Sequence, residues 1–374
     1  MKFSLATAAA VLLASTPAAL AQDANVTAYA TGLLAALNAN NLTALSGLAA
    51  KVQSQLIPVL QANINRNLTV FAPTNAAIAA LGNNVSDDVI FQTIAYHILN
   101  GTYKSDTSDA TVIAPTALTG SPNVYLPAGR PQVVVLAKYE NGTQYVKQPL
   151  SNVTFVQAAI NGVQYQNLLV RPVNTVLTIP GNLTALATRA GLTQLAQLLT
   201  QTQLLQPLDQ SKAGLTIFAP TNAAIEAISA QAAQLNSTQL SAILAQHVLN
   251  GTVAYSNSIP HSAPNAAGNK LTFTKNDTGV FVQIANSTAK ITQTNILFRG
   301  GVVHTIDTVL VDTSSNPTAA NDAFTSAATA GPTPTPSGTG NNGGGNSGAA
   351  APGSKVGAGL LALTLVASGV FVLL

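Results

Sequence analysis

The chain has 374 residues, no cysteine, and a formal net charge of +3 at pH 7, with only 7% of its residues charged. Two of its lysines, Lys2 and Lys355, lie in terminal segments that we expect to be removed, which leaves 13 basic and 12 acidic residues. The remaining Lys and Arg are scattered singly, so the sequence predicts no nucleic-acid partner. Without disulfides, each domain must be held together by its own core.

The first residues, MKFSLATAAAVLLASTPAALAQ, combine a lysine, a short apolar run and an A-x-A ending. This order is typical of a secretory signal peptide, here over residues 1–21, so the mature chain is expected to begin at Gln22. From residue 28 to 60, apolar residues recur at spacings of three and four, which predicts short amphipathic helices.

One phrase occurs twice. The chain reads LTVFAPTNAAIAAL from Leu68 and LTIFAPTNAAIEAI from Leu215, about 147 residues later, with eleven of the fourteen residues identical. That period is too long for a solenoid unit and suits a whole domain, so it indicates a tandem duplication. We expect one domain over residues 22–180 and a second over residues 181–313.

Each copy begins with helices and ends in strands. In the repeated phrase, LTVF and LTIF are typical of strands, and Thr74 and Thr221 stand where each would cap the helix that follows. A second helix, expected over residues 88–99 in the first copy, ends in HILNGT, and its counterpart ends in HVLNGT. Alternating segments separated by Asn-Gly and Asp-Thr-Gly turns then predict a strand meander, which indicates an α+β fold.

The C-terminal part changes composition. Residues 314–348 are rich in Thr, Pro, Gly, Asn and Ser, which is typical of a flexible, O-glycosylated stalk. Residues 349–374 end in an uncharged apolar tail preceded by small residues, which predicts a glycosylphosphatidylinositol (GPI) attachment propeptide with Asn346 as the attachment site. The alternative is a true membrane-spanning tail helix.

Sequons of the form N-x-S/T are frequent, and we expect a heavily glycosylated exterior. The pair at Asn100 and Asn250 recurs at equivalent points of the two copies, in turn-forming sequence. The candidate N-glycosylation sites are Asn25, Asn41, Asn67, Asn84, Asn100, Asn141, Asn152, Asn182, Asn236, Asn250, Asn276 and Asn286.

Two sequence blocks stand out. The first, T-[VI]-F-A-P-T-[ND]-x-A, stands at residues 69–77 and 216–224, and the second, G-x-V-H-x-I-D-x-V-L, stands at residues 301–310 with His304 and Asp307. Together these blocks resemble the fasciclin (FAS1) domain family. The first copy departs from the second block, because Arg171 replaces the histidine and Asn174 the aspartate. Since Pro172 also removes a backbone donor, we expect this segment to be an edge strand or partly unpaired, and Arg171 to matter little for stability.

The resemblance implies two tandem fasciclin domains, each an α+β module with a β-sheet core and helices packed around it, in an anchored glycoprotein of the fungal type. It also implies a place at the cell surface or in the cell wall and a role in adhesion. The family's Tyr-His step, here Tyr96 and His97, is the candidate partner-contact site, while Thr74, Thr221, His304 and Asp307 are expected to be structural.

Catalytic chemistry is not predicted. The four histidines have no zinc-ligand spacing, no nucleophile elbow or cysteine is present, and the only glutamates are Glu140 and Glu226. We therefore expect no enzyme activity, no metal and no cofactor. His304, on an alternating strand, is expected to be a buried imidazole with structural hydrogen bonds.

Three functions stay open. The first is adhesion or matrix interaction through weak multivalent contacts with cell-surface or matrix proteins and glycans, homophilic contacts included, by a protein held outside the plasma membrane or in the wall through its lipid. The second is a structural scaffold glycoprotein of the cell wall, in which the glycans make the contacts. The third is a secreted binder of small apolar ligands, for which a large pocket would be the discriminating feature.

Overall fold

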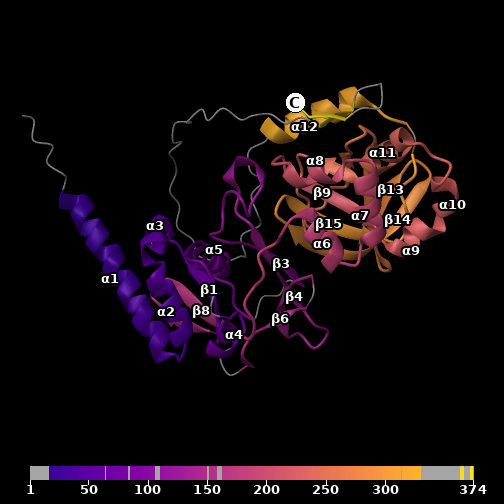
Figure 1. Ribbon diagram of the computed structural model, residues 1–374. Coiled ribbons are helices and arrows are strands. Elements are labelled where there is room, and N and C mark those ends of the chain that lie inside the picture. The colour runs from indigo at the N-terminus through magenta and orange to yellow at the C-terminus, as the bar shows by residue number, and fades with distance from the viewer. Residues whose placement is uncertain are drawn as a thin grey trace, which may run out of the picture.

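The computed structural model describes residues 17–63, 65–82, 85–105, 110–149, 151–157, 162–312 and 314–329, and the backbone of two short segments near the C-terminus. The first half of the chain forms one domain and the second half another, drawn in indigo to magenta and in salmon to orange in Figure 1. Each domain combines helices with β-sheet, which confirms the expected α+β class.

The first domain has two four-stranded sheets, in the strand orders β2-β1-β8-β7 and β3-β4-β5-β6. Its helices are α1 (Pro17–Ala39), α2 (Thr43–Lys51), α3 (Gln53–Asn63), α4 (Asn75–Ala79) and α5 (Asp87–His97). The strands of the first sheet are β1 (Leu68–Pro73), β2 (Ile98–Asn100), β7 (Val163–Tyr165) and β8 (Leu168–Val173). Those of the second are β3 (Thr111–Pro115), β4 (Val133–Lys138), β5 (Gln144–Lys147) and β6 (Val153–Thr154).

The second domain has one seven-stranded sheet in the order β10-β9-β15-β14-β13-β12-β11. Its helices are α6 (Leu183–Arg189), α7 (Thr193–Gln201), α8 (Leu205–Gln210), α9 (Asn222–Ala227), α10 (Ser229–Ala232) and α11 (Ser237–Gln246). Its strands are β9 (Leu215–Pro220), β10 (Val248–Asn250), β11 (Ser262–Pro264), β12 (Lys270–Asn276), β13 (Gly279–Ile284), β14 (Ser287–Phe298) and β15 (Gly301–Ile306). The long strand β14 pairs with β13 through residues 287–290 and with β15 through residues 291–298. Its pairing with β15 contains register shifts, which are typical of β-bulges.

The repeated phrase supplies an inner strand of each domain, β1 and β9, and we call these two the central strands because both of their faces are buried. In the first domain β1 pairs in parallel with β8, and in the second β9 pairs in parallel with β15. Every residue of β1 and β9 is buried, because helices and further sheet cover both faces. These strands are therefore apolar without alternation, which is typical of strands buried on both sides.

The closing segment of the first copy differs from the expectation. Strand β8 is neither an edge strand nor unpaired: it lies between β1 and β7 and matches β1 over all six residues, from Leu168 to Val173. Pro172 is tolerated because β7 pairs only with Leu168 to Val170, so no sheet bond is required from its missing N–H on that side.

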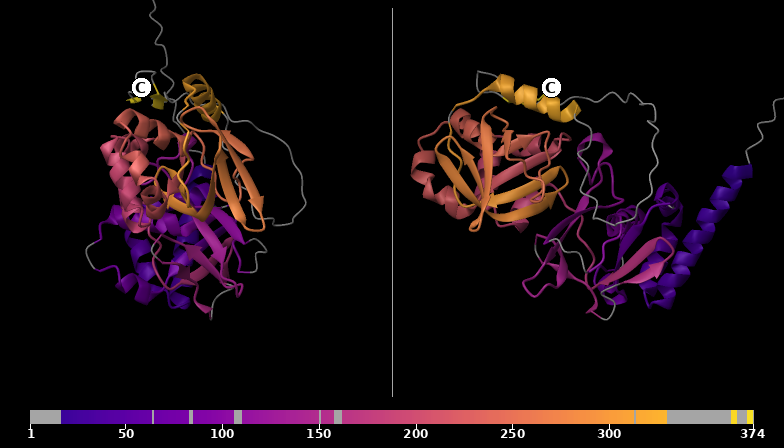
Figure 2. Two further views of the ribbon diagram at one scale, coloured as in Figure 1. Left: turned by 90° about the vertical axis from the view of Figure 1, so that its right-hand side faces the viewer. Right: turned by 180° about the vertical axis from the view of Figure 1, so that it is seen from behind.

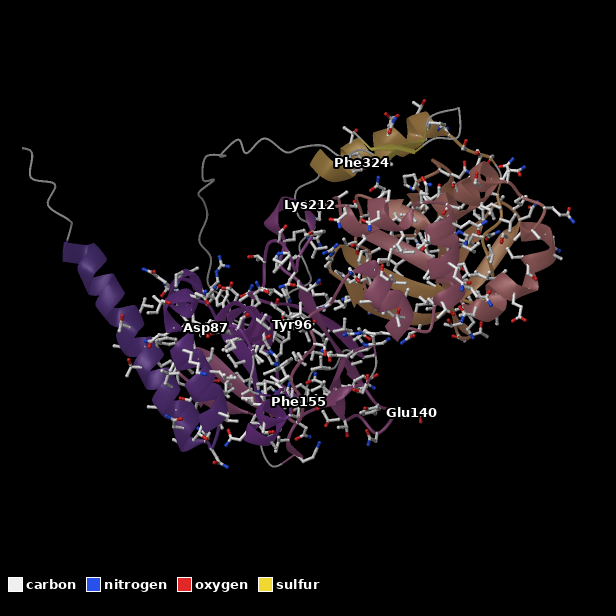
Figure 3. The ribbon with its side chains drawn as sticks, viewed as in Figure 1. Asp87, Tyr96, Glu140, Phe155, Lys212 and Phe324 are labelled. Atoms are coloured by element: carbon white, nitrogen blue, oxygen red, sulfur yellow. The ribbon has the colours of Figure 1, made fainter. Side chains whose placement is uncertain are left out.

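The segment expected to be a stalk also differs. Helix α12 (Pro317–Thr329) lies along the second domain, next to β11, and buries Phe324 to 8% exposure. Figure 2 shows it against that domain from both directions, and Figure 3 labels Phe324 on it. The packed part of the chain thus extends beyond residue 313.

The two ends expected to be processed lie largely outside the described residues. At the N-terminal end, α1 begins at Pro17 and so runs through the expected cleavage point after Ala21. Within the expected anchor signal, the short strands β16 (Leu363–Leu365) and β17 (Phe371–Leu373) pair antiparallel. Among the described residues, no helix is both long enough and apolar enough to cross a bilayer.

Candidate functional site

The two helix caps of the repeated phrase have the same geometry. The Thr74 hydroxyl accepts a hydrogen bond from the backbone N–H of Ala77 at 3.2 Å, and the Thr221 hydroxyl accepts one from Ala224 at 3.3 Å. Each cap satisfies a backbone donor in the first turn of its helix. The caps lie where a central strand passes into a helix, so they fix the chain direction at that point.

The residue after each cap ties two helices together, a role that sequence reasoning missed. The side-chain oxygen of Asn75 accepts the backbone N–H of Ala44 at 2.9 Å, and that of Asn222 accepts the backbone N–H of Gln194 at 3.2 Å. The identity of the two phrases at this position was the available signal. These asparagines thus anchor α2 and α7 to the ends of the central strands.

His97 lies inside the first domain rather than on its surface. It is 2% exposed, its Nδ1 donates to the carbonyl of Thr93 at 2.7 Å, and its Nε2 accepts the backbone N–H of Leu177 at 2.9 Å. The imidazole must be neutral for its Nε2 to accept this bond. Burial lowers the pKa of His97 to about 4, which is consistent with that neutral form.

His247 repeats this geometry in the second domain. Its Nδ1 donates to Ile243 at 2.8 Å and its Nε2 accepts the backbone N–H of Leu310 at 2.9 Å, and burial lowers its pKa to about 4. Each histidine therefore joins the last turn of a helix to the segment that follows the closing strand. We call these two residues the clamp histidines.

Tyr96 is also buried, at 2% exposure, and Figure 3 places it within the first domain. Its hydroxyl donates to the carbonyl of Val133 at 3.1 Å, and burial raises its pKa above the usual range of tyrosine. Direct partner contact by Tyr96 and His97 does not fit this geometry, because neither side chain reaches the surface. The Tyr-His step instead stabilises the interior of the domain.

His304 and Arg171 occupy equivalent positions. His304 pairs with Phe218 in the register of β15 and β9, and Arg171 pairs with Phe71 in the register of β8 and β1. The Nε2 of His304 donates to the carbonyl of Ala254 at 2.9 Å, its ring stacks on that of Phe218, and burial lowers its pKa to about 4.

Arg171 is fully buried, which contradicts the expectation that it matters little. Its guanidinium donates to the carbonyl of Tyr103 at 3.0 Å and to Gln144 Oε1 at 2.7 Å, and it stacks on the ring of Phe155 at 3.7 Å. The arginine therefore takes over both the carbonyl bond and the aromatic stacking of the histidine. The substitution is conspicuous in the sequence, but its partners come from distant strands and could not be found there.

Asp307 has a structural contact at the end of β15. Its Oδ1 accepts the backbone N–H of Lys290 at 2.8 Å, which holds the neighbouring strand. In the first copy the Asn174 side chain donates to the Thr154 hydroxyl at 3.0 Å, again joining the closing segment to its neighbour. The two positions keep a related function with different chemistry.

The domains pack on each other, a feature that the sequence did not predict. The backbone N–H of Tyr125 donates to the carbonyl of Arg299 at 2.7 Å, and the Arg299 guanidinium lies over the Tyr125 ring at 4.3 Å while pairing with Asp209. The buried Gln132 donates to the carbonyl of Phe298 at 3.1 Å.

Apolar side chains complete this interface. Four residues of the second domain belong to the same buried cluster as the β3–β4 region of the first: Val253, Tyr255, Leu297 and Val302. Lys147 reaches across to the carbonyl of Thr294 at 2.6 Å, and burial lowers its pKa. The segment between β3 and β4 that carries Tyr125 is longer than its counterpart between β11 and β12, which was the one sequence signal for this contact.

The described residues hold no group of three or more His, Cys, Asp or Glu side chains that could bind a metal ion. The clamp histidines have both ring nitrogens engaged with the backbone, and His261 is exposed. Asp87 lies at the first turn of α5, and Glu140 at a strand turn, far from each other in Figure 3. No arrangement of these groups matches a catalytic set.

Most of the sequon asparagines with described side chains are exposed: Asn41, Asn67, Asn141, Asn152, Asn182, Asn236, Asn276 and Asn286. The repeated pair behaves differently, because Asn100 and Asn250 are half-buried. The Asn100 amide nitrogen, which a glycan would modify, lies 3.4 Å from the carbonyl of Thr116. Asn25 and Asn84 fall outside the described side chains.

Comparison with known proteins agrees with this architecture. The fasciclin domain model matches residues 40–179 and 190–312, so the chain belongs to the fasciclin domain family. It is 26% identical over 219 residues to a fasciclin-like arabinogalactan protein of Arthroderma benhamiae, an alignment that covers 58% of this chain and 49% of the relative. The chain thus spans about half the length of that relative.

A second relative is the fasciclin-like arabinogalactan protein CTB11 of Cercospora beticola, 26% identical over 260 residues that cover 66% of this chain and 67% of the relative. Among solved structures, a FAS1 domain pair from the insect cell adhesion molecule fasciclin I aligns with 73% of this chain and 97% of its own, at 14% identity and a TM-score of 0.34.

Proposed function

We propose that this chain is a non-enzymatic adhesion or matrix-interaction glycoprotein, displayed outside the plasma membrane or in the cell wall. The observation that supports it is the buried interface between the two fasciclin domains, which holds two similar modules together. Such an arrangement suits multivalent recognition, because each weak contact raises the effective concentration for the next.

The proposal includes a secreted chain that begins at Gln22, a stalk that continues after α12, and a GPI lipid attached at Asn346. Anchoring would place many copies in one plane, where lateral density multiplies weak contacts. Treatment of cells with a phosphatidylinositol-specific phospholipase should release the protein without its C-terminal apolar peptide. Recovery of that peptide in the membrane-bound protein would rule out this form of anchoring.

The test of adhesion uses the secreted body, residues 22–329, because α12 packs on the second domain. Beads that carry this body at graded surface density should adhere to cells, to wall glycans or to beads of the same kind, while the soluble monomer should bind weakly. Adhesion should rise steeply with density, as multivalent contacts require. Absence of adhesion to all of these surfaces at every density would refute the proposal.

A scaffold glycoprotein of the cell wall is the second candidate, favoured by the many exposed sequons. The same beads distinguish the two after enzymatic removal of N-glycans, with the fold checked by circular dichroism. Adhesion that survives deglycosylation comes from the protein surface. Adhesion that is lost with the glycans while the fold persists assigns the contacts to the glycans and supports the scaffold instead.

A further inference from the structure

An apolar groove opens on the first domain between α2, α4 and α5. Its volume is about 260 Å³, and much of its wall is aliphatic: Leu45, Leu48, Ile78, Val85, Ile90 and Ile94. For scale, an apolar cavity of about 150 Å³ is enough to bind benzene. The groove therefore has room for a ligand somewhat larger than one aromatic ring.

Charge is unevenly distributed around this groove. Lys51, at the end of α2, is exposed at the rim. His97 also contributes to the wall, but both of its ring nitrogens are bound to the backbone and burial lowers its pKa to about 4, so it is uncharged at neutral pH. Among the described residues that line the groove, Lys51 is thus the one charged group.

The second domain has different side chains at the equivalent place. Asn75 and Asn222 make the same bond to α2 and α7, which sets Ala44 equivalent to Gln194 and fixes the register of the helices. The repeated phrase sets Ala79 equivalent to Glu226, and the clamp histidines set Thr93 equivalent to Ile243. Larger side chains thus stand at three lining positions of the second domain: Gln194, Glu226 and Ile243. Lys51 is replaced by Gln201.

The chain between α9 and α11 of the second domain also differs from the chain between α4 and α5 of the first. In the second domain it forms α10, and Ile228 packs against the core, whereas its counterpart Leu81 is 48% exposed. Ile225 is 8% exposed, while the equivalent Ile78 is only partly buried. At several of these positions the second domain therefore carries bulkier or more deeply buried side chains than the first.

We propose that the groove of the first domain binds a small amphipathic anion, with its apolar chain between α2, α4 and α5 and its carboxylate beside Lys51. The occupant is a monocarboxylic acid of medium chain length rather than a peptide or a second copy of this chain. The size of the groove limits the apolar part, and the single cation at the rim selects the head group. The proposal is independent of the adhesive function.

Titration calorimetry of the secreted body, residues 22–329, with decanoate tests this site. Decanoate is kept below the concentration at which it self-associates. We expect one saturable site per chain. Thr93→Ile, which installs the residue of the second domain, should weaken binding severalfold because its added bulk takes up part of the groove. Lys51→Gln should weaken decanoate about threefold, as for an exposed ion pair, and leave the neutral analogue decanol unchanged.

Gln201→Lys, the mirror change in the second domain, is the matched control and should create no second site. A decanoate analogue with a diazirine in its chain provides a measurement that needs no variant: its photo-crosslinks should fall on peptides of α2, α4 and α5. The proposal would be overturned by an absence of saturable binding, by crosslinks located elsewhere, or by equal affinity of a folded Thr93→Ile variant.

Discussion

Acid should destabilise this protein through its buried histidines, and His247→Gln is the sharpest test. In the folded state the neutral imidazole accepts the backbone N–H of Leu310, and burial lowers its pKa from 6.5 to about 4. The unfolded chain therefore binds more protons between these two values. The contribution of His247 to stability is complete above pH 6.5 and is lost progressively as the pH falls toward 4.

The magnitude follows from the size of the shift. One pKa unit corresponds to about 1.4 kcal/mol, so the shift of His247 is equivalent to about 3 kcal/mol of unfolding free energy between neutral pH and pH 4. His97 and His304 have similarly lowered pKa values, so they add to the same acid sensitivity. Carboxylates also titrate below pH 5, which makes a comparison between variants necessary.

The assay is urea unfolding followed by circular dichroism, at intervals from pH 7.5 to 4.5. His247→Gln should be less stable at pH 7.5, because the amide replaces only part of the imidazole contacts. Its unfolding free energy should then decline less steeply with acid, by about 2 to 3 kcal/mol over the range. His261→Gln is the control, since His261 is exposed. A pH dependence of His247→Gln that parallels the unmodified protein would refute the reasoning.

Two further predictions concern stability. Arg171→Ala and His304→Ala should each reduce the unfolding free energy by about 2 to 4 kcal/mol in urea titrations. Both substitutions remove a fully buried group that bonds a carbonyl and stacks on an aromatic ring. A loss below about 0.5 kcal/mol for Arg171→Ala would contradict its assigned role. Tyr125→Ala combined with Arg299→Ala should split one calorimetric unfolding transition into two by weakening the domain interface, whereas the exposed Lys275→Ala should not; a single transition in the double variant would argue against coupling through this contact.

The sequence predicted those parts of the fold that depend on local chemistry. The repeated phrase predicted the central strands and the helices after Thr74 and Thr221, because the strand pattern and the cap lie within a few residues of each other. The α+β class followed from the order of helices and strands. All of these signals are short in sequence and strong in physical effect.

The errors arose where side chains meet partners distant in sequence. Tyr96 is buried rather than available to a partner, because β4 covers it and its hydroxyl donates to the carbonyl of Val133. The small role expected of Arg171 rests on the residue that it replaces, whereas the contacts that stabilise it come from Gln144 on β5 and from the ring of Phe155 just after β6. The sequence alone does not show that a charged or hydroxyl-bearing side chain is buried, because the strands that cover it are distant in the sequence.

The end of the second domain explains why the expected stalk began too early. Gln132 and Asn269 are equivalent, because each backbone carbonyl accepts an N–H from the strand before it, from Thr116 and Asn265 respectively. On the first domain the Gln132 side chain binds the second domain, through the carbonyl of Phe298. On the second domain the Asn269 side chain instead donates to the carbonyl of Ser314.

The residues just before α12 therefore contact the second domain at the position equivalent to the one where the first domain contacts the second. Gly268 shows how closely they fit, since a Cβ there would lie 1.8 Å from the carbonyl oxygen of Asn316, whose backbone N–H donates to Ala267 at 2.7 Å. Phe324, further along α12, is buried as well. The composition of residues 314–329 resembles a stalk, but their chemistry is that of a cap that closes the last domain of the pair.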